Sequence, residues 1–134
     1  MTGLFDNHNH SQFSFDGKKT TIEASASSAK AKGLGGICFS DHCDFYVPPM
    51  KAEFENLVPE YFNVAEQQAE IDRVQEMFGN SIRILKGIEI GMYDSSMDKL
   101  KKVLSSHSFD QVNASIHYLN ESDPYYPEYF SDKD

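Results

Sequence analysis

Short apolar runs alternate with longer helical patterns along this chain, and the runs lead into histidine or glutamate side chains. The runs are residues 1–7, Leu34–Phe39, Ile82–Ile88 and Gln111–Ile116. Strands that alternate with helices form parallel sheets, because each parallel connection needs a crossover of helical length. The pattern therefore predicts an α/β fold with about four parallel strands and crossover helices.

The segments between the runs carry helix signals. Thr20 and Glu23 have the spacing of a capping box, which predicts that a helix begins there. Apolar residues spaced by three, four and seven predict two more helices, at Pro59–Phe78 and Ser95–Ser106. The apolar stripe of the longer helix, which includes Tyr61, is assigned to the core.

Two segments lack a regular pattern. Asp44–Lys51 contains two consecutive prolines and is expected to be a loop, which could cover a site. Tyr46 and Met50 on this loop are candidates to touch a ligand. After Leu119 the chain is polar and aromatic, which indicates a loop or the start of a further helix.

The side chains that follow the runs have the chemistry of metal ligands. His8 and His10 are two residues apart, so an extended backbone presents both on one face, where they can bind one ion. Imidazole is a common metal ligand, and carboxylates bind or orient beside it. His42, Glu89 and His117 follow later runs, and the carboxyl ends of parallel strands meet at one face. We therefore expect these five side chains to converge.

The charge balance limits the classes of molecule that the protein is expected to bind. The formal net charge is −9, from 21 acidic and 12 basic residues. A protein that binds a nucleic-acid backbone needs a basic face, so this balance argues against nucleic acid as a partner. A small phosphorylated substrate remains compatible with it, because bound cations invert the local charge of a site.

The sequence also suggests a compartment. No apolar run approaches the length of a membrane span, and the polar Asp6 and Asn7 come too early for a signal peptide, so we expect no membrane partner. Cys38 and Cys43 lack the spacing of a disulfide framework. A cytoplasmic, reducing location is the simplest interpretation.

Four motifs resemble those of the PHP (polymerase and histidinol phosphatase) domain. They are Asp6-x-His8-x-His10-Ser11 continuing to Asp16-Gly17, then Ser40-Asp41-His42, Gly87-Ile88-Glu89 and Ala114-Ser115-Ile116-His117. Their order and spacing are similar to the family's over essentially the whole chain. Within the family, Ser40–Phe45 and Ile84–His117 are most similar to the monofunctional histidinol-phosphate phosphatases.

The resemblance implies a cluster of two or three divalent metal ions, Zn, Mn or Fe. The implied ligands are His8, His10, Asp16, His42, Glu89 and His117. Glu89 would bridge the ion of the first two histidines to an ion bound by His117, and a third ion would lie between Asp16 and His42. Several relatives have a histidine at the position of Asp16, so the third site here would be richer in oxygen.

The resemblance also implies the fold, the N-terminal half of a distorted (β/α)7 TIM-like barrel. Residues 1–134 would form the N-terminal portion of a PHP domain, because a complete member is considerably longer. The remaining ligands and most phosphate-binding side chains would lie in the missing portion. A complementing C-terminal half or a second copy of the chain would then cover the open edge of the sheet. Asp6 and Asp41 are candidates to hold an imidazole by its second nitrogen.

The implied activity is metal-dependent hydrolysis of L-histidinol phosphate to L-histidinol and phosphate, a step of histidine biosynthesis. Asp16, His42, Glu89 and His117 would be the catalytic residues. Two alternatives stay open. One is a metallonuclease or proofreading module of the same family, and the other is an incomplete domain that binds metal without turnover.

Overall fold

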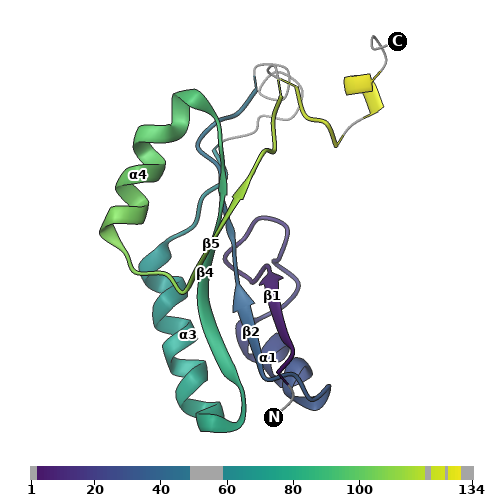
Figure 1. Ribbon diagram of the computed structural model, residues 1–134, viewed down its shortest axis with the longest axis vertical. Helices are drawn as coiled ribbons and strands as arrows, with labels where there is room; N and C mark the ends of the chain where they lie inside the picture. Colours follow the sequence, from purple (N-terminus) through teal and green to yellow (C-terminus); the bar gives the residue numbers. More distant parts are fainter. Residues whose placement is uncertain (1–2, 49–58, 120–121, 126, 131–134) are drawn as a thin grey trace.

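We analysed a computed structural model that describes residues 3–48, 59–119, 122–125 and 127–130. The strands are β1 (Phe5–Asn9), β2 (Gly36–Phe39), β3 (His42–Cys43), β4 (Arg83–Gly91) and β5 (Gln111–Ser115). All pair in parallel, with β1 beside β2, β2 and β3 both beside β4, and β5 on the other side of β4 (Figure 1). The prediction of a parallel α/β sheet is confirmed.

β2 and β3 are two parts of one interrupted strand. Phe39 lies opposite Lys86 and His42 lies opposite Glu89, so the register on β4 is unchanged across the break at Ser40. The sheet therefore has four positions in space, as the sequence predicts.

β4 is longer than predicted. Its bounds, Arg83–Gly91, put Glu89 inside the strand rather than after it. The cause is pairing on both sides, because β3 and β5 each bond to the second half of β4. Glu89 is therefore held by a ladder on either side, and its side chain projects from a rigid element.

The helices are α1 (Ile22–Ala31), α3 (Val64–Phe78) and α4 (Met97–Ser106), and short 3-10 turns cover Gly79–Ser81, Asp94–Ser96 and Pro127–Phe130. The N-cap of α1 is Thr21 and not Thr20, because Thr21 is extended and its side chain accepts from the amide of Ala24. Thr20 contacts the Ser25 hydroxyl instead.

α3 begins at Val64, five residues after the predicted start at Pro59, since Asn63 caps the helix by accepting from the amide of Glu66. Tyr61 therefore precedes the helix, and the prediction that it belongs to the core is wrong, because Tyr61 is 61% exposed. Ile71 and Val74 of the predicted stripe are buried.

The helices pack on one face of the sheet, and the site lies on the other. Ile84 joins the cluster beneath α1 and α3, while Ile88 and Ile90 pack with Leu100 of α4. Since side chains alternate along a strand, Glu89 projects from the opposite face. In Figure 1, α3 and α4 run along one side of β4, away from β1.

The two cysteines, Cys38 and Cys43, are buried free thiols. Met50 and the end of its predicted loop lie outside the described residues. No helix in the described part of the chain is long and apolar enough to cross a membrane.

Candidate metal centre

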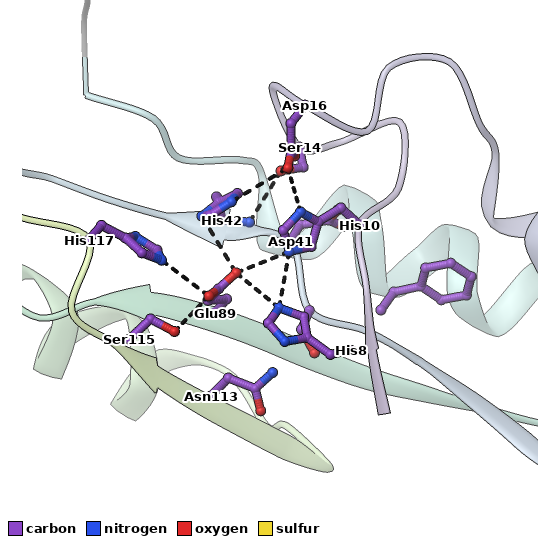
Figure 2. Close-up of polar contacts among 12 residues, drawn as sticks. His8, His10, Ser14, Asp16, Asp41, His42, Glu89, Asn113, Ser115 and His117 are labelled. Carbon is purple, nitrogen blue, oxygen red and sulfur yellow. Dashed lines mark hydrogen bonds and ion pairs between the residues drawn. The ribbon is translucent and has the colours of Figure 1, made fainter. Parts of the chain in front are cut away.

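Glu89 lies at the centre of the predicted site (Figure 2). Its Oε2 is 3.0 Å from Nε2 of both His8 and His10. Its Oε1 is 3.1 Å from Nε2 of His117 and accepts a 2.6 Å hydrogen bond from the Ser115 hydroxyl. The two carboxylate oxygens therefore face two different sets of histidines.

The structure brings all six predicted ligands together. Three overlapping groups have donor atoms within 4.8 Å of one another, namely His8, His10 and Glu89; His10, Asp16 and His42; and His42, Asp44 and His117. The residues come from β1, the turn after it, β3, β4 and the end of β5. Parallel strands and their carboxyl ends account for this convergence.

The first group fits a tetrahedral metal site. His8 Nε2, His10 Nε2 and Glu89 Oε2 form a triangle with sides of 3.1, 3.0 and 3.0 Å. Bonds of about 2.0–2.1 Å to zinc place neighbouring tetrahedral ligand atoms roughly 3.3 Å apart. A proton on one of the two Nε2 atoms can form a hydrogen bond with only one of the other two atoms of this triangle. One cation, in contrast, would accept a lone pair from all three atoms. The donor set therefore suits a divalent metal.

The second group depends on the turn after β1. Asp16 Oδ2 accepts a 2.7 Å hydrogen bond from His10 Nδ1 and lies 3.6 Å from His42 Nε2. The Ser14 hydroxyl donates to the other oxygen of Asp16 at 2.6 Å and orients the carboxylate. Backbone hydrogen bonds from Ser14 to Ser11 and from Gly17 to Ser14 close the turn.

Asp44 is a residue of the site that the sequence analysis missed. Its carboxylate accepts from His117 Nδ1 at 2.8 Å and from His42 Nδ1 at 3.3 Å, and the side chain is only 4% exposed. Asp44 can orient both rings or join them as a ligand. Asp44 follows His42 by two residues, the same spacing as between His8 and His10. This spacing could have predicted that Asp44 lies on the same face as His42.

The prediction that Asp41 holds an imidazole is wrong. Asp41 accepts from the amide and hydroxyl of Ser11 at 2.5 and 2.7 Å, and from Gln67 Nε2 at 2.7 Å. It therefore fixes the turn that carries Asp16, rather than a ring. Asp6, the other candidate, lies on β1, and its side chain makes no hydrogen bond or ion pair with any residue that the structure describes.

The electrostatics of the cluster are those of imidazolium rings around carboxylates. A hydrogen bond to Asp44, followed by one to Glu89, raises the pKa of His117 to about 10, and the bond to Glu89 raises the pKa of His10 to about 9. Burial raises the pKa of Glu89, but hydrogen bonds from His10, His117 and Ser115 outweigh it and hold that pKa well below its usual range. Protons on these rings compete with metal ions for the same nitrogens.

Two glycines flank Glu89 on β4, and one of them, Gly91, makes room for the cluster. A Cβ at Gly91 would collide with the Asp44 carboxylate and lie 3.1 Å from His117 Nδ1. A Cβ at Gly87 would lie 2.6 Å from both Cys38 Sγ and the Ser40 hydroxyl. Glu89 is flanked by both positions, so the strand is bare on either side of it.

Residues 6–134 match the model of the PHP domain family. The chain belongs to the PHP domain family. A histidinol-phosphatase from Lactococcus lactis is 36% identical over 120 residues, which are 90% of this chain and 41% of that protein. A probable histidinol-phosphatase from Deinococcus radiodurans is 34% identical over 122 residues, which are 89% of this chain and 44% of that protein.

A solved structure is similar to this PHP domain in fold. It is the crystal structure of histidinol phosphate phosphatase from Lactococcus lactis complexed with Zn, L-histidinol and phosphate. The TM-score is 0.76 at 31% identity, and the match covers 89% of this chain and 42% of that one. The predicted half of a TIM-like barrel is thus confirmed, and this PHP domain spans less than half the length of the relatives it matches.

Proposed function

We propose that this PHP domain is the metal-binding part of a phosphatase that hydrolyses L-histidinol phosphate to L-histidinol and phosphate. The observation that carries the proposal is the position of the Glu89 carboxylate between the histidines. One oxygen faces His8 and His10, and the other faces His117. A carboxylate placed between two sets of histidines has the form of a bridging ligand. The names of the similar proteins supply the substrate.

In this proposal the ligands are those predicted, and Asp44 orients two of them. The ligands are His8, His10, Asp16, His42, Glu89 and His117. Divalent ions held there would supply positive charge for phosphoryl oxygens and lower the pKa of bound water. The chain itself orients the ligands: Ser115 fixes the Glu89 carboxylate, and Asp44 fixes the rings of His42 and His117 by their Nδ1 atoms.

The metal also accounts for the acidic balance of the chain. With a net charge of −9, the polypeptide alone would repel a phosphate monoester, and two or three divalent ions would reverse the sign at the centre. Zn, Mn and Fe all suit imidazole and carboxylate donors. We infer that Asp16, His42, Glu89 and His117 lie closest to the reacting phosphoryl group.

A second reading follows from the length of the match. Because this PHP domain spans 41% to 44% of its relatives, it could bind metal without turning over substrate unless a complementing C-terminal half or a second copy joins it.

The buried free thiols of Cys38 and Cys43 are compatible with the reducing cytoplasm that we infer as its location.

Metal content and phosphate release test the proposal together. The chain is purified without chelator, loaded with Zn or Mn, and its metal per chain is measured by elemental mass spectrometry. Glu89→Gln keeps the size of the side chain but removes one bridging oxygen, and Glu76→Gln on the exposed face of α3 is the matched control. We expect at least two ions per chain and release of phosphate from L-histidinol phosphate, both lost in Glu89→Gln only.

Two results would change the conclusion. Metal binding without release of phosphate would show that this chain is an incomplete domain, and phosphatase activity would then need the complementing half. Hydrolysis of a single-stranded oligonucleotide in preference to L-histidinol phosphate would assign the centre to a nuclease.

A further inference from the structure

The carbonyl of Asn7 lies directly before the candidate ligand His8, and a side chain from β5 holds it. Gln111 donates a 2.8 Å hydrogen bond from Nε2 to this carbonyl, which is 104 residues away in the sequence. We propose that Gln111 is a positioning residue that fixes the β1 backbone so that His8 reaches the metal ion. The inference rests on the proposed function, because the ion belongs to the proposed metal centre.

β1 contains one more residue than the part of β2 with which it pairs. The register pairs on either side of the extra residue are Asp6 with Ile37 and Asn9 with Phe39. Asn7 and His8 together therefore oppose Cys38 alone, which is the arrangement of a β-bulge. A bulge leaves backbone groups outside the regular ladder, and the Asn7 carbonyl bonded to Gln111 belongs to this irregular part.

Phe5, at the start of β1, lies on the site face, which is the side of the sheet that carries Glu89. A Cβ at Gly36 would collide with the Phe5 ring, so Phe5 and the Cβ position of Gly36 share one side. Cys38, two residues later on β2, shares this side by alternation, and its Sγ lies 2.6 Å from the position of a Cβ at Gly87. Gly87 and Glu89 share a side of β4 for the same reason.

The bulge decides which side chains of β1 point toward the metal centre. Regular alternation from Phe5 would place Asn7 on the site face and turn both histidines away from it. The extra residue reverses this order, so His8 and His10 reach the Glu89 carboxylate. The conformation of the bulge is therefore a condition for the metal centre to form.

His8 depends on the backbone of the bulge more than His10 does. His10 is also held by Asp16, which accepts a 2.7 Å hydrogen bond from its Nδ1. The His8 side chain is 43% exposed, against 20% for His10, so packing restrains it less. Its direction is therefore set mainly by the β1 backbone and by the Gln111 bond that holds this backbone.

Gln111 reaches the bulge from the site face of β5. Asn113 and Ser115 lie along one side of β5, toward Glu89 (Figure 2). Gln111 shares this side because it precedes Asn113 by two residues. β2 and β4 lie between β1 and β5, so the Gln111 side chain crosses the inside of the curled sheet. Its Nε2 also donates to Asn113 Oδ1 at 2.6 Å, so both hydrogen atoms of the amide are bonded.

Metal binding tests the inference in variants that change the donor or its reach. Gln111→Met keeps the length of the side chain without a donor, and Gln111→Asn keeps the amide on a shorter side chain. Gln68→Met is the matched control, because Gln68 donates to the Ser108 carbonyl at the surface. Zn affinity is measured by competition titration, the geometry of bound Co²⁺ by visible absorption, and the fold by circular dichroism.

A double-mutant cycle separates positioning from general stability. His8→Ala removes the ligand that follows Asn7, so a residue that acts through His8 loses its effect on Zn affinity in this background. Two independent effects would instead multiply. The cycle compares wild type, Gln111→Met, His8→Ala and the variant with both changes.

We expect both Gln111 variants to weaken Zn binding at least tenfold and to change the Co²⁺ spectrum, while Gln68→Met stays within twofold. Added to His8→Ala, Gln111→Met should weaken Zn less than twofold. Zn affinity within twofold of wild type in a folded Gln111 variant would overturn the positioning role, as would a tenfold loss repeated in the His8→Ala background. Loss of the fold in both Gln111 variants would also overturn it and assign Gln111 to the stability of the sheet.

The same titrations distinguish this inference from the proposed function. A wild-type chain that binds no Zn would overturn the metal centre and the role of Gln111 together. Zn binding that depends on Gln111 as expected, without release of phosphate from L-histidinol phosphate, would count against the activity alone and support the positioning role.

Discussion

Replacement of Gln67 by leucine should destabilise the support beneath the metal centre. Gln67 is fully buried on α3, and its Nε2 donates a 2.7 Å hydrogen bond to Oδ2 of Asp41. Asp41, also fully buried, accepts from the amide and hydroxyl of Ser11. Gln67→Leu keeps the buried volume and removes one of the donors that balance the Asp41 carboxylate.

Two opposing energies set the magnitude. A hydrogen bond to a charged group contributes about 1.5–3 kcal/mol, and its loss leaves the buried carboxylate less satisfied. Gln67 Oε1, however, is buried with no hydrogen-bond partner among the described residues, and its removal returns about 1 kcal/mol. The net effect is a destabilisation of about 0.5–2 kcal/mol. For a domain of this size that lowers Tm by roughly 2–8 °C.

Thermal unfolding followed by circular dichroism measures this effect on metal-free protein. Gln68→Leu is the control, because Gln68 is adjacent on α3 but donates to the Ser108 carbonyl at the surface. Its Tm should fall by no more than about 2 °C, as surface substitutions change stability by within ±0.5 kcal/mol. An equal Tm in Gln67→Leu and wild type, or equal losses in both variants, would refute the role given to the Gln67–Asp41 pair.

Three further predictions concern the centre itself. Ser115→Ala removes the hydroxyl that orients Glu89 and should weaken Zn binding by about 10–100-fold in a competition titration, with Tm nearly unchanged. Asp44→Asn keeps the shape but not the charge between His42 and His117 and should weaken Zn by a similar 10–100-fold, and equal affinity would show that Asp44 holds neither ring. Gly91→Ala puts a methyl group where the Asp44 carboxylate lies and should cost about 1–3 kcal/mol of stability together with bound metal, whereas Gly3→Ala, with open space around it, should cost neither.

The sequence predicts the parts of this fold that depend on periodicity. The parallel strands and the three helices follow from apolar spacing, and the convergence of His8, Glu89 and His117 follows from their places on parallel strands. Element boundaries were less predictable. The apolar residue Tyr61 matched the helical spacing of α3, but the Asn63 cap starts the helix after it.

Asp41 was predicted to hold an imidazole ring, but Asp44 does so in the structure. Both carboxylates flank His42, so either could have held its ring. Side-chain alternation decides between them, because the residue two positions after His42 shares its face of the strand and the residue before it does not. Asp44 then shares the face of His42 and reaches Nδ1 of two rings, while Asp41 is left before the resumed strand, facing Ser11 and Gln67. The spacing of two residues between His42 and Asp44 was therefore a usable local signal, whereas the contacts of Asp41 with Ser11 and Gln67 join segments that are far apart in the sequence.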